Sequence, residues 1–141
     1  MSNEFPFIGS LRNETAELDT FKEYAWDFEN DCFKYDGNGK HILLEKNEAL
    51  ETWIYKALKT ERYSYIAYSW QYGIELKPFV GKVMSVQERK SELKRIIVEC
   101  LMVNPWIKSV DSITFEDKNH GENLLTTIDL TTVYGEVTVN V

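Results

Sequence analysis

The sequence has few cysteines and no long hydrophobic run, and each shortage excludes a class of protein. Its only thiols are Cys32 and Cys100, and in a cytoplasmic domain of this size we expect both to be free. No stretch approaches the roughly 18 consecutive apolar residues of a membrane span, and the N-terminus lacks the basic and apolar regions of a signal peptide. We therefore expect a protein that is made and kept in a cytoplasm, with no membrane partner.

An excess of positive charge is also missing. The formal net charge is −7, and residues 1–50 carry 11 acidic against 5 basic side chains, whereas residues 51–141 carry 12 against 11. Because such a surface repels phosphate, we expect no nucleic-acid partner. The acidic N-terminal part is either a solvated leader or a surface that docks on a basic neighbour.

Signatures of catalysis and cofactor binding are scarce. His41 and His120 stand in or beside turns, without cysteine or aspartate at a metal-ligand spacing. The glycines of Asp36-Gly37-Asn38-Gly39 lie between two predicted strands, which is not the strand-to-helix context of a phosphate loop. We expect no metal and no cofactor. The one enzymatic hypothesis is a glycosidase with the carboxylate pair Glu61 and Glu75, which would have to face each other across a cleft.

Periodicity predicts an α+β fold in one domain. Residues 1–20 form an extended or mobile leader in this interpretation, and residues 21–141 form the domain. The alternation of Tyr24, Trp26 and Phe28 predicts a first strand with a covered aromatic face. A hairpin follows, in which residues 33–35 and 41–44 flank the Asp-Gly-Asn-Gly turn.

Two helices are predicted, near Lys46 to Thr60 and Val86 to Val103, packed on a mixed or antiparallel sheet. Asn47 is a possible N-cap of the first helix, and Ser85 and Glu88 have the spacing of a capping box at the second. Each helix has one apolar stripe at helical spacing. The stripes consist of Leu50, Trp53, Ile54, Ala57 and Leu58, and of Leu93, Ile96, Ile97, Cys100 and Leu101.

Extended segments complete the prediction. Both faces of the run from Tyr63 to Trp70 carry bulk, which predicts a strand covered on two sides. The terminal sheet begins near Ile107, turns at Asn119-His120-Gly121, and continues through residues 124–132 and 133–141. In the last strand the valines at positions 133, 137, 139 and 141 share one face, so this strand is either internal to the sheet or an exposed edge.

Three short motifs carry a family resemblance: Thr60-Glu61-Arg62, Tyr72-Gly73-Ile74-Glu75-Leu76, and Asn104-Pro105-Trp106-Ile107. From about Trp26 to its end the chain resembles the XkdS-like proteins of contractile phage tails and their wider relatives. These relatives are the baseplate wedge subunits that start the sheath, including TssE of type VI secretion. Thr60 stands where the wider family has the glycine of a Gly-Glu-Arg turn. Of its Glu-Pro-Arg signature only the proline, Pro105, is kept.

The resemblance implies a structural baseplate wedge subunit of a contractile phage tail or tail-like particle, assembled in the bacterial host cytoplasm. It would link the baseplate to the first sheath ring and nucleate sheath assembly by strand pairing. The implied partners are other wedge proteins, the tail sheath protein, and hub or tube proteins. The implied partner-binding residues are Glu61, Arg62, Tyr72, Pro105, Trp106, Val137, Val139 and Val141. The alternatives are a tail-associated lysozyme-like glycosidase and a free-standing binding module.

Overall fold

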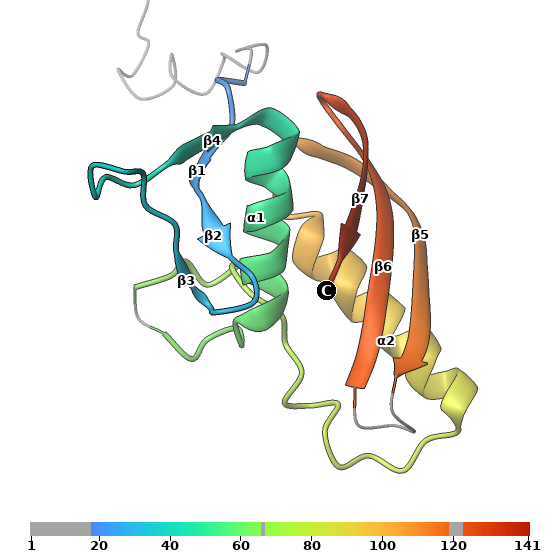
Figure 1. Cartoon of the computed structure of the whole chain (residues 1–141). Helices are drawn as coiled ribbons and strands as arrows, with labels where there is room; N and C mark the ends of the chain where they lie inside the picture. The colour runs from blue at the N-terminus through green and yellow to red at the C-terminus, as the bar shows by residue number, and fades with distance from the viewer. Residues whose placement is uncertain (1–17, 66, 119–122) are drawn as a thin grey trace, which may run out of the picture.

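The computed structural model describes residues 18–65, 67–118 and 123–141, and it confirms the α+β class (Figure 1). No helix in these ranges has the length and apolar character to cross a membrane. The elements in chain order are β1 (Lys22–Tyr24), β2 (Trp26–Asp27), β3 (Cys32–Phe33), β4 (Leu43–Glu45), α1 (Lys46–Lys59), α2 (Val86–Leu101), β5 (Ile107–Lys118), β6 (Asn123–Thr132) and β7 (Gly135–Asn140).

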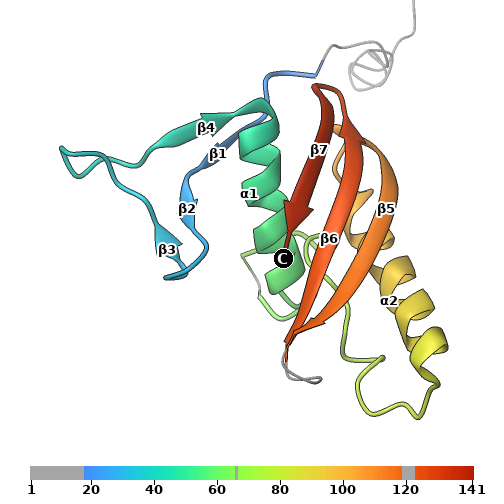
Figure 2. The ribbon, with the colours of Figure 1, turned by 45° about the vertical axis from the view of Figure 1, so that its right-hand side comes forward.

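The main sheet is an antiparallel meander in the order β5-β6-β7. Its register places Ile113, Ile128 and Val139 side by side, and all three are buried. Figures 1 and 2 show α1 beside β7, and α2 running behind the sheet toward β5. The predicted antiparallel sheet is confirmed, whereas the turn predicted at residues 119–121 lies outside the described residues.

Three of the five predicted stripe residues of α1 are buried, and Trp53 and Leu58 pack partly buried against the core. Leu50, Ile54 and Ala57 have no exposed surface. The N-cap differs from the prediction. The N-cap residue is Glu45, and no side chain caps the helix. Asn47, the predicted cap, lies inside the first turn, where its Oδ1 accepts a hydrogen bond from Thr132 Oγ1 at 2.6 Å. The Asn47 side chain therefore bonds to Thr132 on β6 and does not cap the helix.

Helix α2 begins as predicted. The Glu88 N–H donates to Ser85 Oγ at 3.2 Å, and the Ser85 N–H donates to Glu88 Oε2 at 3.0 Å, which completes a capping box. Four of the five predicted stripe residues are buried, and Leu93 packs partly buried against the core. The helix ends at Leu101, two residues before the predicted Val103, and a turn in which Asn104 N–H donates to the Leu101 carbonyl leads toward β5.

The predicted turn after Tyr35 is present, and one isolated antiparallel bridge joins Tyr35 to His41 beside it. The predicted arms, residues 33–35 and 41–44, otherwise pair with earlier strands rather than with each other. β1 pairs with β4 and β2 with β3, and the chain reverses at residues 36–40.

The covered aromatic face predicted for the first strand is not confirmed. Ala25 is buried, while Tyr24 is 48% and Phe28 40% exposed. The small alanine side chain takes the inner position, Tyr24 and Phe28 remain outside, and Trp26 is half-buried. There Trp26 and Phe33 lie 4.8 Å apart, with Lys56 Nζ 4.9 Å from each ring centroid.

The strand predicted over Tyr63 to Trp70 is wrong. Between α1 and α2 the described residues form turns, and their only β-type pairing is one parallel bridge between Glu61 and Ile74. Tyr63 has a φ of 66°, in the left-handed region. Alternating aromatic residues imitate the period of a strand, but here no neighbouring strand pairs with them.

Candidate functional site

Glu61 closes the base of the loop that follows α1. Its carboxylate accepts hydrogen bonds from the backbone N–H groups of Leu76 at 3.2 Å and Lys77 at 3.1 Å. Alongside, Ile74 N–H donates to the Thr60 carbonyl at 2.9 Å, and Arg62 N–H donates to the Ile74 carbonyl at 2.8 Å. The two ends of the loop are therefore joined side by side, as in an Ω-loop.

Arg62 ties the same loop to α2. Its Nε donates to the Gly73 carbonyl at 3.1 Å, and its guanidinium forms an ion pair with Glu99 at 3.2 Å. Only 8% of Arg62 is exposed. Glu61 and Arg62 thus both fix the turn. They do so through separate partners rather than through an ion pair with each other.

Gly73 allows this close approach of the two loop ends. Its φ is 97°, in the region that favours glycine. We call the bonded residues 60–62 and 73–77 the clamp. A Cβ at position 73 would lie 2.6 Å from the Thr60 carbonyl oxygen and 3.2 Å from Arg62 N, and both of these atoms belong to the backbone of the clamp. Any side chain here would push the clamped ends apart.

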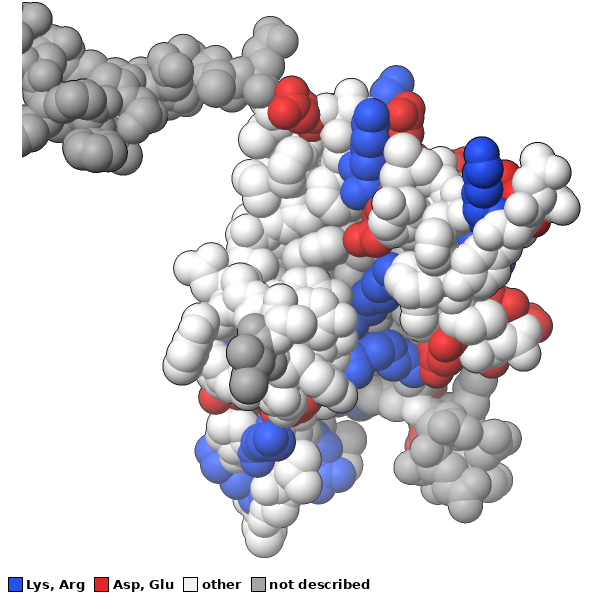
Figure 3. Space-filling model, turned by 90° about the vertical axis from the view of Figure 1, so that its left-hand side faces the viewer, with Lys and Arg blue, Asp and Glu red and all other residues white. Residues whose placement is uncertain are grey.

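The loop between the clamped ends carries several exposed aromatic rings. We call residues 63–72 the aromatic loop; its residue 66 lies outside the described residues. Tyr63, Tyr65 and Tyr68 are 49–59% exposed, and Trp70 is 81% exposed. Together with Ser69 these rings line a hollow of about 250 Å³. Figure 3 looks at the side that carries this loop and the β1–β4 hairpin, and shows broad uncharged areas separated by a line of charged side chains.

Tyr72 connects the aromatic loop to the body of the protein. Its ring lies 4.6 Å from that of Tyr68 and 5.9 Å from that of Trp53 on α1. Burial, with a smaller contribution from Tyr68, raises the pKa of Tyr72 to about 12. The phenol is therefore neutral at physiological pH, and its ring anchors the loop against α1.

Trp106 lies at the edge of a second hollow of about 230 Å³, which we call the Trp106 hollow. It packs against Phe21 at 5.0 Å between ring centroids, and its Nε1 donates to the Asp19 carbonyl at 2.8 Å. Asn104 is buried and accepts a hydrogen bond from Trp106 N–H, whereas Pro105 is exposed. The hollow is lined by Phe21, Trp53, Ser69, Gln71, Tyr72, Val103, Asn104, Pro105 and Trp106.

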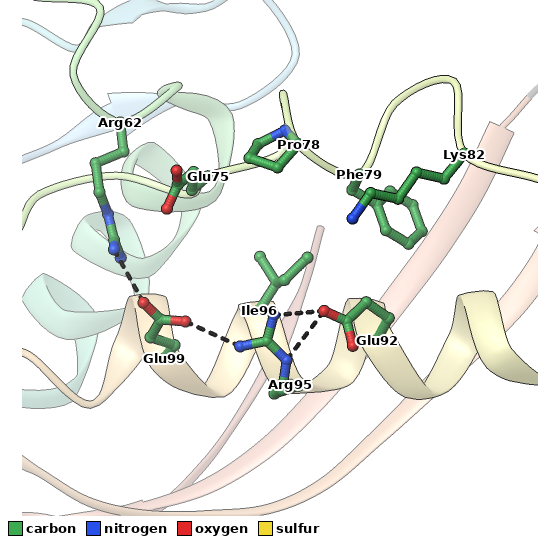
Figure 4. A pocket seen from close by; sticks show the side chains of 9 residues that line it. All are labelled: Arg62, Glu75, Pro78, Phe79, Lys82, Glu92, Arg95, Ile96 and Glu99. Atoms are coloured by element: carbon green, nitrogen blue, oxygen red, sulfur yellow. Dashed lines mark hydrogen bonds and ion pairs between the residues drawn. The ribbon is translucent and has the colours of Figure 1, made fainter.

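A charged groove of about 260 Å³ runs between α2 and residues 75–82 (Figure 4). On its α2 side Glu99 pairs with both Arg62 and Arg95, and Arg95 also pairs with Glu92. The hydrogen bond from Arg95 lowers the pKa of Glu92. Glu75, Pro78, Phe79 and Lys82 line the opposite side. Most of the charge in this groove is therefore neutralised within the chain.

The proposed carboxylate pair does not share this groove. Glu75 lines it, but Glu61 is not among the lining residues, and its carboxylate is engaged with the backbone of Leu76 and Lys77. Within the described residues, no group of three or more His, Cys, Asp or Glu side chains is placed to hold a metal ion.

The predicted valine face points into the protein. Val139 is 1% exposed, and Val137 and Val141 pack partly buried against the core. Val133 does not share this face, because it lies 38% exposed in the turn before β7. β7 pairs with β6 alone among the described strands, so it is an edge of the sheet rather than an internal member. Beside its end, Val141 lines a hollow of about 200 Å³ together with residues of α1 and α2, including Leu58, Lys59 and Ile97.

Sequence reasoning missed Glu99 as the partner of Arg62. The available signal was the spacing of Arg95 and Glu99, four residues apart on α2, which is typical of a solvated ion pair on a helix surface. That pair is present, but the second carboxylate oxygen reaches a loop 37 positions away. No local pattern indicates such a contact.

Comparison with known proteins shows the family of this chain. Residues 22–135 match the contractile injection system sheath initiator family. The chain belongs to this family. It is also 32% identical over 104 residues to the phage-like element PBSX protein XkdS of Bacillus subtilis (strain 168). The aligned region covers 73% of this chain and 70% of the relative. The sheath initiator therefore has a structural role related to contractile phage tails, in a virion tail or tail-like particle.

The matched range frames the fold closely. It begins at Lys22, the first residue of β1, and ends at Gly135, the first residue of β7. The clamp, the aromatic loop, the charged groove and Trp106 all lie inside it. Val137 and Val139 of β7, and Val141 after that strand, lie beyond the matched range.

Proposed function

We propose that this sheath initiator is a baseplate wedge subunit that links the baseplate to the first sheath ring and nucleates sheath assembly by strand pairing. The observation that carries the proposal is the position of β7 at the edge of the main sheet. An edge strand presents backbone donors and acceptors to another chain, with little demand on that chain's sequence. This suits a surface that starts a polymer of sheath subunits.

The hydrogen-bond pattern identifies the outward donors of β7. Val141 and Thr126 exchange both backbone bonds, at 2.8 and 2.9 Å. Because such pairs alternate along an antiparallel ladder, the N–H groups of Val137 and Val139 point toward β6. Those of Glu136, Thr138 and Asn140 point away from it. An incoming strand would bind these three groups, and the hollow beside Val141 would receive one of its apolar side chains.

Thr138→Pro tests this proposal. Proline removes one outward N–H while leaving the ladder to β6 intact, which is the position where an edge strand accepts it. The substitution also removes the hydrogen bond from Thr138 Oγ1 to Asp129 Oδ1. Thr138→Val, which loses the hydroxyl but keeps the N–H, is the matched control.

We expect Thr138→Pro baseplates to assemble without sheath, and Thr138→Val baseplates to carry sheath of normal length. Deleting residues 136–141 should also prevent sheath assembly, but it removes buried Val139 as well and is the less specific test. Normal sheath on Thr138→Pro baseplates, with a tail map that shows no foreign strand along β7, would contradict the proposal.

The remaining partner-binding residues divide into two kinds. Pro105 and Trp106 offer surface to a wedge neighbour or to hub or tube proteins. Glu61, Arg62 and Tyr72 act indirectly, because their side chains hold the aromatic loop in place. We propose a location in the tail baseplate, assembly in the host cytoplasm, and no nucleic-acid or membrane partner.

We further propose that the protein has no catalytic activity of its own, in preference to the glycosidase alternative. The structural engagement of Glu61 and its separation from the groove of Glu75 support this choice. Glu61→Gln and Glu75→Gln should leave the lytic activity of tail preparations unchanged, once particle yield is normalised. Intact tails that specifically lose peptidoglycan cleavage would overturn it.

A further inference from the structure

The hollow of the aromatic loop is lined almost entirely by rings. Of the described residues that line it, four are aromatic and one is a serine: Tyr63, Tyr65, Tyr68, Ser69 and Trp70. The sequence between Arg62 and Glu75 contains no charged residue, although 28% of the chain is charged. A group that enters this hollow therefore meets ring faces and hydroxyl groups.

The rings around the hollow keep open faces. Tyr63 and Trp70 lie 5.7 Å apart at an interplanar angle of 57°, and Tyr65 and Tyr68 lie 5.9 Å apart at 81°. Because the rings of neither pair lie parallel, they do not cover each other's faces as stacked rings do. Trp70 is 81% exposed, so its indole is available to a ligand.

Aromatic faces of this kind attract positive charge. The π-system of a ring is negative over its face, and an ammonium or guanidinium group within about 6 Å of the ring centroid is drawn to it. The same chain makes this contact elsewhere, where Lys56 Nζ lies 4.9 Å from the ring centroid of Trp26. Among the described residues, the lysine–ring contacts all lie outside the aromatic loop. Lys77 bonds to Ser64 Oγ beside the loop, but it does not line the hollow.

The charge of the whole protein favours the same kind of ligand. The formal net charge is −7, and its field attracts basic groups and repels acidic ones. A sugar also stacks on rings, but it needs several polar groups to fix its orientation. Among the described lining residues, Ser69 is the one that is not aromatic. A basic side chain needs little more than the ring faces themselves.

We propose that the hollow of the aromatic loop binds an arginine side chain from a neighbouring protein of the tail baseplate. A guanidinium is planar and more weakly hydrated than an ammonium, so it stacks on rings at a lower cost of desolvation. The clamp already joins the two ends of the loop, which lowers the entropic cost of binding. The proposal rests on the proposed place of the protein in the baseplate, but not on strand pairing at β7.

NMR titration of the full-length protein tests the chemistry of the hollow. The probe is N-acetyl-arginine amide, and its matched control is N-acetyl-citrulline amide, which has nearly the same shape and no charge. We expect the arginine probe to shift the amide resonances of residues 67–72 saturably, and the citrulline probe to bind roughly 2- to 30-fold more weakly. Equal binding of the two probes, or tighter binding of N-acetyl-leucine amide or N-acetylglucosamine, would overturn the proposal.

Two variants locate the binding in the hollow. Trp70→Leu removes a ring face but keeps an apolar side chain, and it should weaken the arginine probe by a factor in the same range. Tyr35→Leu is the matched control, because Tyr35 is a 56% exposed ring outside the loop, and it should leave the titration unchanged. Unchanged resonances of α1 and α2 report that both variants remain folded. Equal effects of the two substitutions would contradict the assignment to the hollow.

Tail particles test the source of the arginine. Baseplates should incorporate less Trp70→Leu than Trp70→Phe subunit, because phenylalanine keeps a ring face. Thr138→Pro subunits should be incorporated normally and fail only at the sheath, so the failure of this proposal is distinguishable from the failure of strand pairing. A map of the assembled tail should show a neighbour's arginine in the hollow. Equal incorporation of Trp70→Leu and Trp70→Phe, with a map that shows no such arginine, would overturn the proposed partner.

Discussion

Arg62 and Glu99 lie 3.2 Å apart and join the loop after α1 to α2 across 37 positions of sequence. The two partners differ in environment, since the Arg62 side chain is 8% exposed and the Glu99 side chain 52%. An exposed carboxylate contributes little to an ion pair because water screens it. The buried guanidinium, with its second bond to the Gly73 carbonyl, therefore carries most of the stabilisation.

Truncating Arg62 should accordingly cost more than neutralising Glu99. We expect Arg62→Ala to lower the free energy of unfolding by about 1 to 3 kcal/mol, because it leaves a buried carbonyl without its partner. Glu99→Gln should cost at most about 1 kcal/mol. Urea unfolding followed by circular dichroism measures both changes. Equal losses would show that the ion pair, and not the buried guanidinium, holds the loop.

Gly73→Ala should open the clamp. The new Cβ would meet the Thr60 carbonyl oxygen at 2.6 Å on a backbone with a φ of 97°, so we expect a loss above about 1 kcal/mol in the free energy of unfolding. Gly37→Ala is the matched control, because Gly37 has open space around its Cβ position and no positive φ. A loss at Gly73 no larger than that at Gly37 would contradict this account of the clamp.

Local patterns predicted most of the regular structure. The stripes of α1 and α2, the capping box at Ser85 and the period-two valines of β7 each depend on residues close in sequence, and each is present in the fold. The packing of the two helices on an antiparallel sheet also followed, because an apolar stripe and an apolar sheet face must cover each other.

The predictions that failed depended on distant partners. Asn47 was predicted to cap α1, but its side chain bonds to Thr132, 85 positions away. The segment from Tyr63 to Trp70 has the alternation of a strand, yet a strand also needs a neighbour. Here the residues that flank the segment, 60–62 and 73–74, bond to each other instead. Period alone does not distinguish a paired strand from a clamped loop.

Ile97→Ala tests the core that both helices share. Ile97 is 4% exposed and lies in the cluster between α2 and the sheet, so its truncation should cost about 2 to 5 kcal/mol. Val98→Ala, at the neighbouring and 37% exposed position, should change the free energy of unfolding by no more than about half a kcal/mol. A loss that small at Ile97 would show that the stripe does not form the core.

The buried thiol of Cys100 should make stability decline at alkaline pH. Burial raises its pKa from 9.0 to about 12, so its contribution to stability is complete below about pH 9 and is lost as the pH rises toward 12. Linkage gives a loss of about 1.4 kcal/mol at pH 10. In a Cys32→Ala background, which leaves one thiol, the stability difference between Cys100 and Cys100→Ala should shrink by that amount between pH 7 and pH 10. Urea unfolding at both pH values measures it, and a constant difference would show that the folded protein accommodates the thiolate.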